Sequence, residues 1–272
     1  MGLIDRLHST VDALAQRGPL HGLAMRQAHR EFLANRERNL FFGVYASWED
    51  AAAAARDCGA VGYDNAGSAA LYDDRVRMDP HDYPSLYWLN RSLAEGLRGV
   101  LDVGGAIGIK FLAFREHLSG FPDLEWRVQD VPAMVARGRE LAIQRGDAPR
   151  LSFTERFDDG EGSDVLFASG VLQYLPSTLG ELLAGWRRLP RRIVVNTAAI
   201  HPQHAFFTVN SLGTAFCPYR VQTQAGLVRG LSTLGYRLRE AWINPDKPLL
   251  IPHRPDHSLR HYSGYCLDLA GP

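Results

Sequence analysis

The residues best placed to do chemistry lie in one short segment, Gly99 to Phe111. An apolar run ends in an acidic residue, Asp102, and glycines follow at positions 104, 105 and 108. The next residues, from Lys110 to Leu118, have the pattern of a helix. A strand, a tight glycine turn and a helix in this order form a site for a nucleotide-like ligand at the carboxyl end of a parallel strand.

The spacing of these glycines argues against two kinds of phosphate site. A dinucleotide-binding turn has glycines at its first and third positions and a small residue at its sixth. Counted from Gly104, those last two positions hold Ala106 and the bulky Ile109, which would keep the helix away from the strand. A P-loop places a serine or threonine after its lysine, whereas Phe111 follows Lys110. Both phosphate-binding interpretations are therefore disfavoured.

A second acidic residue follows the turn at a distance that is typical of nucleotide-binding sites. The segment from Leu124 to Asp130 has the pattern of the next strand and ends in a carboxylate. Asp130 follows the glycine turn by about 20 residues, the distance at which an acidic residue meets the ribose hydroxyls of a bound nucleotide. Its two oxygens can accept hydrogen bonds from both hydroxyls of a vicinal diol. Asp102, the glycines and Asp130 together predict a nucleoside-binding site.

The composition excludes several classes of partner. The 272 residues include 30 Lys and Arg against 30 Asp and Glu, so there is no basic surplus to bind a nucleic-acid backbone. Cys58, Cys217 and Cys266 are widely spaced and form no metal-binding pair, which favours a reducing cytoplasm. The first ten residues contain Asp5 and Arg6 and so lack a signal-peptide core. No apolar run reaches the length of a membrane span.

Strands and helices alternate from residue 99 onward. This alternation predicts an α/β fold with a parallel sheet covered by helices on both faces. Strands are expected at 99–103, 125–130, 150–154, 164–168, 191–197, 236–242 and 261–269, and helices at 108–118, 132–145, 178–188 and 223–234. Before residue 95 the pattern is mainly helical, over 2–17, 20–38, 49–56 and 84–97. We therefore expect a helical lid over 1–95 and a ligand-binding core over 96–272.

The glycine turn resembles the first motif of class I S-adenosylmethionine (SAM) methyltransferases. It reads Asp102-Val103-Gly104-Gly105-Ala106-Ile107-Gly108, with Ala106 in place of the usual middle glycine. Asp130-Val131-Pro132 is similar to the Asp-Leu-Pro of many small-molecule O-methyltransferases. This resemblance implies a Rossmann-like sheet of seven strands, the last two antiparallel. It also implies SAM as cofactor, S-adenosylhomocysteine as product and a set of cofactor contacts: Asp102, Gly104, Gly105, Ala106, Gly108, Asp130, Val131, Phe157, Ser169 and Gly170.

Four further phrases resemble an uncharacterised bacterial methyltransferase family that is often associated with surface-polysaccharide gene clusters. They are Phe42-Gly43-Val44-Tyr45-Ala46-Ser47-Trp48, Leu101-Asp102-Val103-Gly104-Gly105, Ala168-Ser169-Gly170-Val171-Leu172-Gln173-Tyr174-Leu175 and Gly213-Thr214-Ala215-Phe216-Cys217-Pro218-Tyr219-Arg220. They extend the likeness to nearly the whole chain. The resemblance implies methyl transfer and names no acceptor.

The loops that follow the fourth and fifth strands are the expected place for the methyl acceptor. His201 and His204 follow the fifth strand, where an imidazole of near-neutral pKa could take a proton from a hydroxyl or amine. Their spacing also suggests a metal, but the sequence offers no convincing third ligand. Tyr174 is a third catalytic candidate. Gln173, Tyr219, Tyr87 and Trp88 are expected to contact substrate. Tyr45, Trp48, Tyr72 and Tyr83 are further candidates for an aromatic lid, although for any single aromatic residue packing between lid and core is the favoured interpretation.

These observations favour a SAM-dependent methyltransferase acting on a small molecule or a glycan intermediate, on oxygen rather than nitrogen. Two alternatives stay open. One is a non-catalytic protein that keeps the SAM-binding fold as a scaffold or partner subunit. The other is a nicotinamide-dependent oxidoreductase, which Ile109 disfavours. A homodimer is a further expectation.

Overall fold

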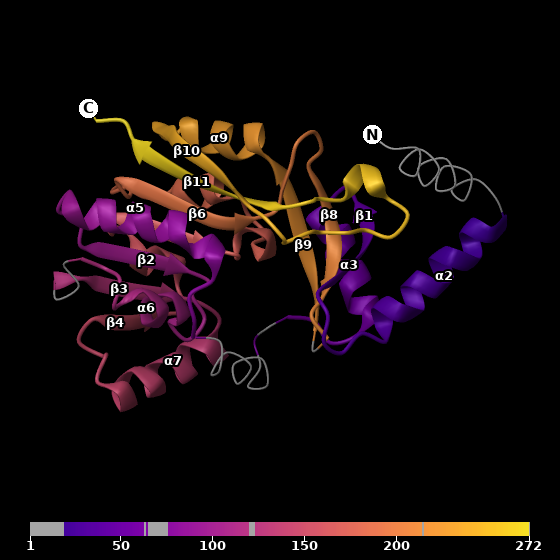
Figure 1. The fold of residues 1–272 in the computed structure, drawn as a ribbon, viewed down its shortest axis with the longest axis horizontal. Helices are drawn as coiled ribbons and strands as arrows, with labels where there is room; N and C mark the ends of the chain where they lie inside the picture. Colours follow the sequence, from indigo (N-terminus) through magenta and orange to yellow (C-terminus); the bar gives the residue numbers. More distant parts are fainter. Residues whose placement is uncertain (1–18, 63, 65–75, 120–122, 214, 272) are drawn as a thin grey trace.

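The computed structural model describes residues 19–62, 64, 76–119, 123–213 and 215–271. Its larger sheet has seven strands in the order β10-β11-β6-β5-β2-β3-β4 (Figure 1). Only β11 runs against its neighbours, pairing antiparallel with both β10 and β6. The bounds are β2 Gly99–Val103, β3 Glu125–Gln129, β4 Leu151–Thr154, β5 Val165–Ser169, β6 Arg192–Ala198, β10 Tyr236–Asn244 and β11 Tyr262–Leu269. The predicted α/β fold and its seven-stranded sheet are confirmed.

Helices cover both faces of this sheet. On one face, buried side chains of α5 (Tyr83–Ala94), α6 (Ile109–Phe114) and α7 (Pro132–Arg145) pack against Trp126 and Phe167. On the other face, α8 (Leu179–Leu183) and α9 (Gln224–Ser232) pack against Leu101 and Leu166. β2, β5 and β6 are buried along nearly their whole length, because helices cover them on both sides. No helix in the described part of the chain is long and apolar enough to cross a membrane.

A second sheet lies beside the carboxyl edge of the first and is steeply inclined to it in Figure 1. Its order is β1-β8-β9-β7, in which only β7 and β9 are parallel. The bounds are β1 Leu40–Tyr45, β7 Ile200–His201, β8 Phe206–Ser211 and β9 Phe216–Thr223. α2 (Pro19–Leu33) and α3 (Trp48–Cys58) cover it through a small core that includes Phe32, Ala55 and Val209.

This second sheet differs from the expected helical lid. β1 belongs to the N-terminal region, and its partner β8 comes from the segment after β6, where the sequence suggested only a loop. Residues on either side of position 95 therefore share one sheet. The predicted helices at 20–38, 49–56 and 84–97 are present as α2, α3 and α5, and Ser47 caps α3 by accepting a hydrogen bond from the amide of Asp50. The predicted helix over 2–17 lies outside the described residues.

Candidate active site

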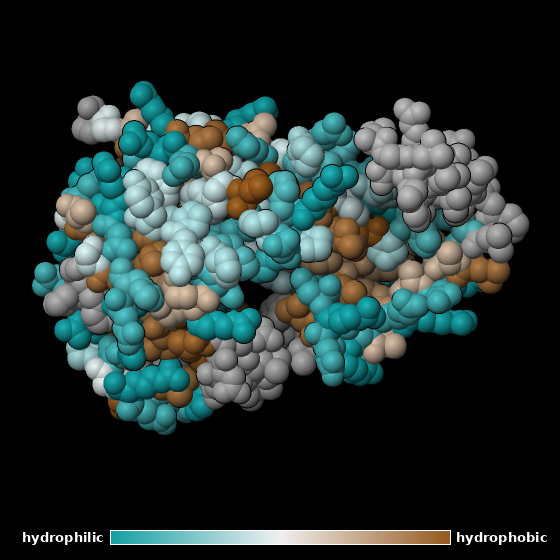
Figure 2. Space-filling view, viewed as in Figure 1, coloured by the Kyte–Doolittle hydropathy of each residue, from teal (hydrophilic) through white to brown (hydrophobic). Residues whose placement is uncertain are grey.

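A cavity of about 570 Å³ lies at the carboxyl edge of the larger sheet. Figure 2 shows a hollow at this place, between the core and the second sheet. The turn after β2, the ends of β3 and β5, and the second sheet all contribute to its wall. The lining residues are Trp48, Gly62, Asp79, Asp102, Gly104, Gly105, Ala106, Ile109, Lys110, Gln129, Asp130, Val131, Met134, Ser169, Gly170, Val171, Tyr174, Leu175, Leu212, Cys217 and Pro218.

The turn after β2 adopts a conformation that favours glycine. Gly104, Ala106 and Gly108 have φ angles of 66°, 51° and 87°, all in the left-handed region. A Cβ atom on Gly104 would lie 2.2 Å from a methyl group of Val171, and one on Gly105 would lie 2.4 Å from the carboxylate of Asp102. The turn therefore brings the backbone directly against Asp102. Ala106 tolerates a left-handed φ at a cost of about 1–2 kcal/mol.

Asp102 is a buried carboxylate at the cavity wall. Only 1% of the residue is exposed, and Nε1 of Trp126 donates a hydrogen bond of 3.1 Å to its Oδ2. Burial raises the pKa of Asp102 to about 7, although the Trp126 hydrogen bond and the charge of Lys110 act in the opposite direction. A carboxyl group held in this way gains most from a ligand that brings a positive charge to it.

Asp130 links the ends of β2 and β3. Its Oδ2 accepts a 2.7 Å hydrogen bond from the amide of Ala106, and its Oδ1 accepts one of 2.7 Å from the amide of Val131. Burial raises the pKa of Asp130, and these two hydrogen bonds counteract the shift. Each carboxylate oxygen has a further lone pair, so Asp130 can hold the glycine turn and still accept hydrogen bonds from a diol.

Tyr174 lies on the side of the cavity nearer the second sheet. Its hydroxyl donates a 2.9 Å hydrogen bond to Oδ1 of Asn210. The Nδ2 of Asn210 donates to Oδ1 of Asn39 at 2.6 Å and to the carbonyl of Leu40 at 3.0 Å, which fixes the amide's orientation. The hydroxyl hydrogen of Tyr174 is therefore directed at Asn210.

Nine of the predicted site residues line this cavity: Asp102, Gly104, Gly105, Ala106, Asp130, Val131, Ser169, Gly170 and Tyr174. Trp48 from the expected aromatic lid lines it as well. Tyr72 lies outside the described residues. Tyr45 and Tyr83 are not among the lining residues.

Six further predicted contacts lie elsewhere. Gly108 caps the start of α6, and Phe157 packs on Trp186 with ring centroids 4.8 Å apart. Gln173 is buried and donates to the carbonyl of Thr197 at 3.3 Å. The remaining three do not line the cavity either. The hydroxyls of Tyr219 and Tyr262 hydrogen-bond each other, Trp88 donates a hydrogen bond to Glu240, and Tyr87 is 55% exposed.

The two histidines proposed as bases do not line the cavity. The chain leaves β6 to form β7, which pairs with β9 and carries His201 into the second sheet. Its Nδ1 accepts hydrogen bonds from the amides of Gln203 and His204 at 3.1 and 2.9 Å, and burial with the neighbouring His204 lowers the pKa of His201. His204 stacks between His201 and His257. These positions give no support to their predicted role as bases.

The sequence reasoning missed a group of charged residues at the cavity. Lys110 and Asp79 both line it, and Lys110 forms a 2.7 Å ion pair with the buried Asp82. The only sequence signal for this charged group is the position of Lys110, two residues after the last glycine of the turn. The two aspartates come from η1 (Pro80–Asp82) and the residue before it, which no spacing connects to the turn.

Neither a family model nor a curated protein sequence matches the chain. Solved structures of similar fold include Burkholderia thailandensis 1,6-didemethyltoxoflavin-N1-methyltransferase, crystallised with S-adenosylhomocysteine, at 18% identity and a TM-score of 0.49 over 82% of this chain and 87% of that one. Magnesium protoporphyrin IX methyltransferase from Synechocystis matches at 14% identity and a TM-score of 0.46, over 69% and 81%. Mitomycin 7-O-methyltransferase matches at 15% identity and a TM-score of 0.49, over 95% of this chain and 71% of that one.

Proposed function

We propose that this protein is a SAM-dependent methyltransferase whose cofactor and acceptor share the cavity at the carboxyl edge of the larger sheet. The observation that carries the proposal is the arrangement of two carboxylates, the buried Asp102 and the partly buried Asp130, around the glycine turn. Asp102 suits the ammonium of the methionyl end, and Asp130 on the next strand suits the ribose diol. The apolar side chains of Ile109, Val131 and Met134 complete this part of the wall.

SAM supplies a methyl group on a positively charged sulfur, so the protein has mainly to align the acceptor and exclude water. The second sheet would do the latter, because Leu212, Cys217 and Pro218 close the cavity from that side. Tyr174, which lines the cavity with its hydroxyl bonded to Asn210, would contact the methyl acceptor. We further propose a small-molecule acceptor methylated on oxygen, with a glycan intermediate as one class. A homodimer stays a prediction.

Calorimetric titration with S-adenosylhomocysteine tests the cofactor assignment. We expect saturable binding with one site per chain, since the described cavity offers a single glycine turn flanked by carboxylates. A parallel titration with NADH checks the oxidoreductase alternative. Failure of the folded protein to bind S-adenosylhomocysteine would overturn the proposed function.

Replacing Asp130 with alanine should weaken this binding. The substitution removes the acceptor for the ribose hydroxyls and also releases the amide of Ala106. Loss of one or two charge-assisted hydrogen bonds, at about 1.5–3 kcal/mol each, predicts a decrease in affinity of at least roughly tenfold. The exposed Asp123, before the amino end of β3, provides the control, and Asp123→Ala should bind as the wild type does. Equal affinity of both variants would exclude Asp130 from the site.

A further inference from the structure

A cation and an anion lie on the same wall of the cavity, on either side of the glycine turn. Asp102 ends β2, and Lys110 is the second residue of α6. Both line the cavity, together with Gly104, Gly105, Ala106 and Ile109 between them. A ligand that bridges the turn with one positive and one negative group would complement both side chains. The methionyl end of SAM carries such a pair, an ammonium and a carboxylate.

The ammonium of Lys110 is held in place by a buried carboxylate. The side chain of Lys110 is 19% exposed, and its Nζ lies 2.7 Å from Oδ2 of Asp82, whose side chain is 1% exposed. The same Oδ2 accepts a 2.9 Å hydrogen bond from the amide of Asp79. An ammonium has three N–H donors, and a single carboxylate oxygen occupies only one of them. Lys110 can therefore keep its contact with Asp82 and donate to a second acceptor in the cavity.

The turn that carries Asp82 is fixed to the larger sheet. The carbonyl of His81 accepts hydrogen bonds from Nδ2 of Asn196 at 3.0 Å and from Nδ2 of Asn244 at 3.4 Å. Both asparagines are completely buried, and they bond each other at 3.1 Å. The position of Asp82, and through it that of Lys110, is thus set before any ligand arrives. A cation placed in advance loses less side-chain entropy when it binds.

Stability alone does not explain this ion pair. The other carboxylate oxygen of Asp82, Oδ1, is buried and has no hydrogen-bond partner among the described residues. A buried carboxylate with one oxygen unpaired is costly, and apolar replacements for buried ion pairs are often neutral or stabilising. A role in orienting Lys110 toward the cavity accounts for its presence.

We propose that Lys110 binds the methionyl carboxylate of the cofactor and that Asp82 is the positioning residue that orients it. This inference rests on the proposed function, because it assumes that SAM occupies the cavity. To the ammonium contact of Asp102 it adds a second contact with the same amino-acid group. Ligands that carry the amino-acid carboxylate should be favoured over those that end at the thioether.

The experiment compares two ligands that differ in the amino-acid group, and it follows how the loss of Lys110 changes the affinity for each. S-Adenosylhomocysteine has the whole amino-acid group, whereas 5′-deoxy-5′-methylthioadenosine keeps the nucleoside and lacks it. The test variant combines Lys110→Gln with Asp82→Asn, which removes both charges and leaves no carboxylate unpaired. The control combines Arg115→Gln with Asp147→Asn, a 3.3 Å ion pair between the residue after α6 and the loop after α7, and neither residue lines the cavity.

Calorimetry should show S-adenosylhomocysteine binding about 10- to 100-fold more weakly to the test variant, the usual effect of losing one charge-assisted hydrogen bond. Its affinity for methylthioadenosine should stay within about twofold of the wild type, because the ribose contacts are unchanged. Lys110→Arg should retain most of the affinity, and the control should bind both ligands normally.

Three results would count against the proposal, and they are distinguishable. Unchanged S-adenosylhomocysteine affinity in a folded test variant would overturn the role of Lys110. An equal loss for both ligands would show a general disturbance of the site and would also overturn it. Failure of the wild-type protein to bind either ligand would instead overturn the proposed function itself.

Discussion

At the scale of single residues, Asp102 makes ligand binding and folding respond to pH in opposite directions. Burial raises its pKa from 3.8 to about 7 in the unliganded protein. Its stabilising contribution is therefore complete below pH 3.8 and is lost as the pH rises through about 7. The ammonium group of the ligand favours the ionised carboxylate, so affinity for S-adenosylhomocysteine should fall as the pH drops below about 7, by up to about tenfold per unit.

This linkage is measurable as proton release. Calorimetric titrations at pH 6 in two buffers of different ionisation enthalpy should give different apparent enthalpies of binding. Asp102→Asn is the matched control, since it preserves the shape of the side chain and cannot titrate. Its binding should be weaker and free of proton release. Proton release of the same size in this variant would assign the titration to another group.

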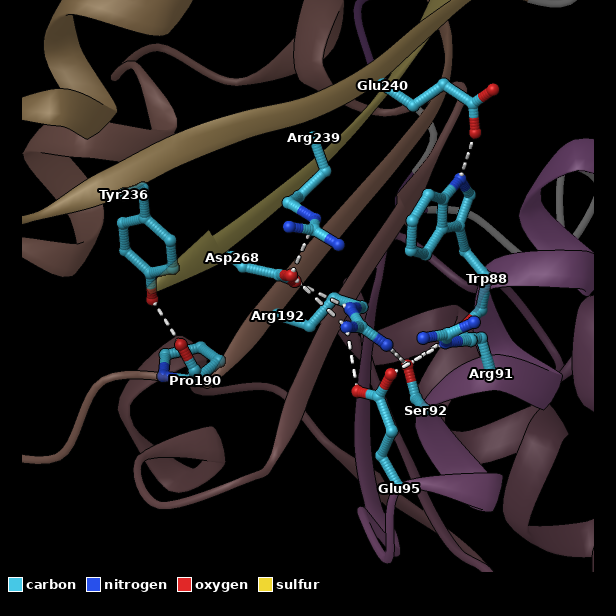
Figure 3. A network of polar contacts seen from close by, with 10 residues as sticks. All are labelled: Trp88, Arg91, Ser92, Glu95, Pro190, Arg192, Tyr236, Arg239, Glu240 and Asp268. Atoms are coloured by element: carbon cyan, nitrogen blue, oxygen red, sulfur yellow. Dashed lines mark hydrogen bonds and ion pairs between the residues drawn. The ribbon is translucent and has the colours of Figure 1, made fainter. Parts of the chain in front are cut away.

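At the scale of elements, an ion-pair network docks α5 against the amino end of β6 (Figure 3). Arg192 is 4% exposed and bonds Asp268 on β11 at 2.7 Å and Glu95 after α5 at 2.9 Å. Its guanidinium also lies over the ring of Trp88, 5.1 Å from the centroid. Arg192→Met keeps the stem of the side chain but removes the charge shared by the two carboxylates.

We expect Arg192→Met to lower the free energy of unfolding by about 2–4 kcal/mol, slightly below the usual cost of breaking a buried pair. The reduction is moderated because Arg239 and Arg91 remain beside Asp268 and Glu95. Urea unfolding followed by circular dichroism measures the change. Arg237→Met, on the exposed side of β10, should stay within about 0.5 kcal/mol of wild type. Equal midpoints for the two variants would show that the network does not stabilise the docking of α5.

At the same scale, sequence patterns predict the strands of the larger sheet but not those of the second sheet. The strands of the larger sheet begin and end within two residues of their predicted bounds, because each is an apolar run or a run of mixed apolar and polar residues closed by a turn. β8 was missed since polar residues such as Thr208 and Asn210 are buried there. β9 does alternate, with Cys217, Tyr219 and Val221 buried, but Pro218 argues against a strand.

The half of the site built on the glycine turn was predictable, whereas the rest depends on tertiary pairing. The glycine turn and Asp130 belong to neighbouring strands, so their spacing along the chain carries the geometry. Ala106 departs from the motif only at the cost of a left-handed φ. Lys110 and Asp82 are 28 positions apart in the sequence and meet only through tertiary contacts. His201 lies outside the site because β7, which carries it, belongs to the second sheet. No local pattern predicts either result.

At the scale of the whole molecule, the cavity is shared by two sheets with different tasks. The larger sheet supplies the carboxylates and the glycine turn, and the second sheet supplies Leu212, Cys217 and Pro218. Because β1 and β8 come from distant parts of the chain, the second sheet forms only when the N-terminal region has folded onto the segment after β6. If the cofactor occupies only the part of the cavity beside the glycine turn, its binding should slow hydrogen exchange in the larger sheet more than in the second sheet.

Hydrogen exchange measured by mass spectrometry can resolve this difference. S-Adenosylhomocysteine should slow exchange in peptides covering residues 99–110 and 125–135, where bound ligand opposes local opening. Exchange in peptides from β8 and β9 should slow much less, because their side of the cavity is the proposed binding place of the methyl acceptor. Peptides from β10, at the far edge of the larger sheet, serve as the internal control. Equal protection of β8, β9 and the glycine turn would mean that the cofactor alone fills the cavity, and the acceptor would then have to bind elsewhere.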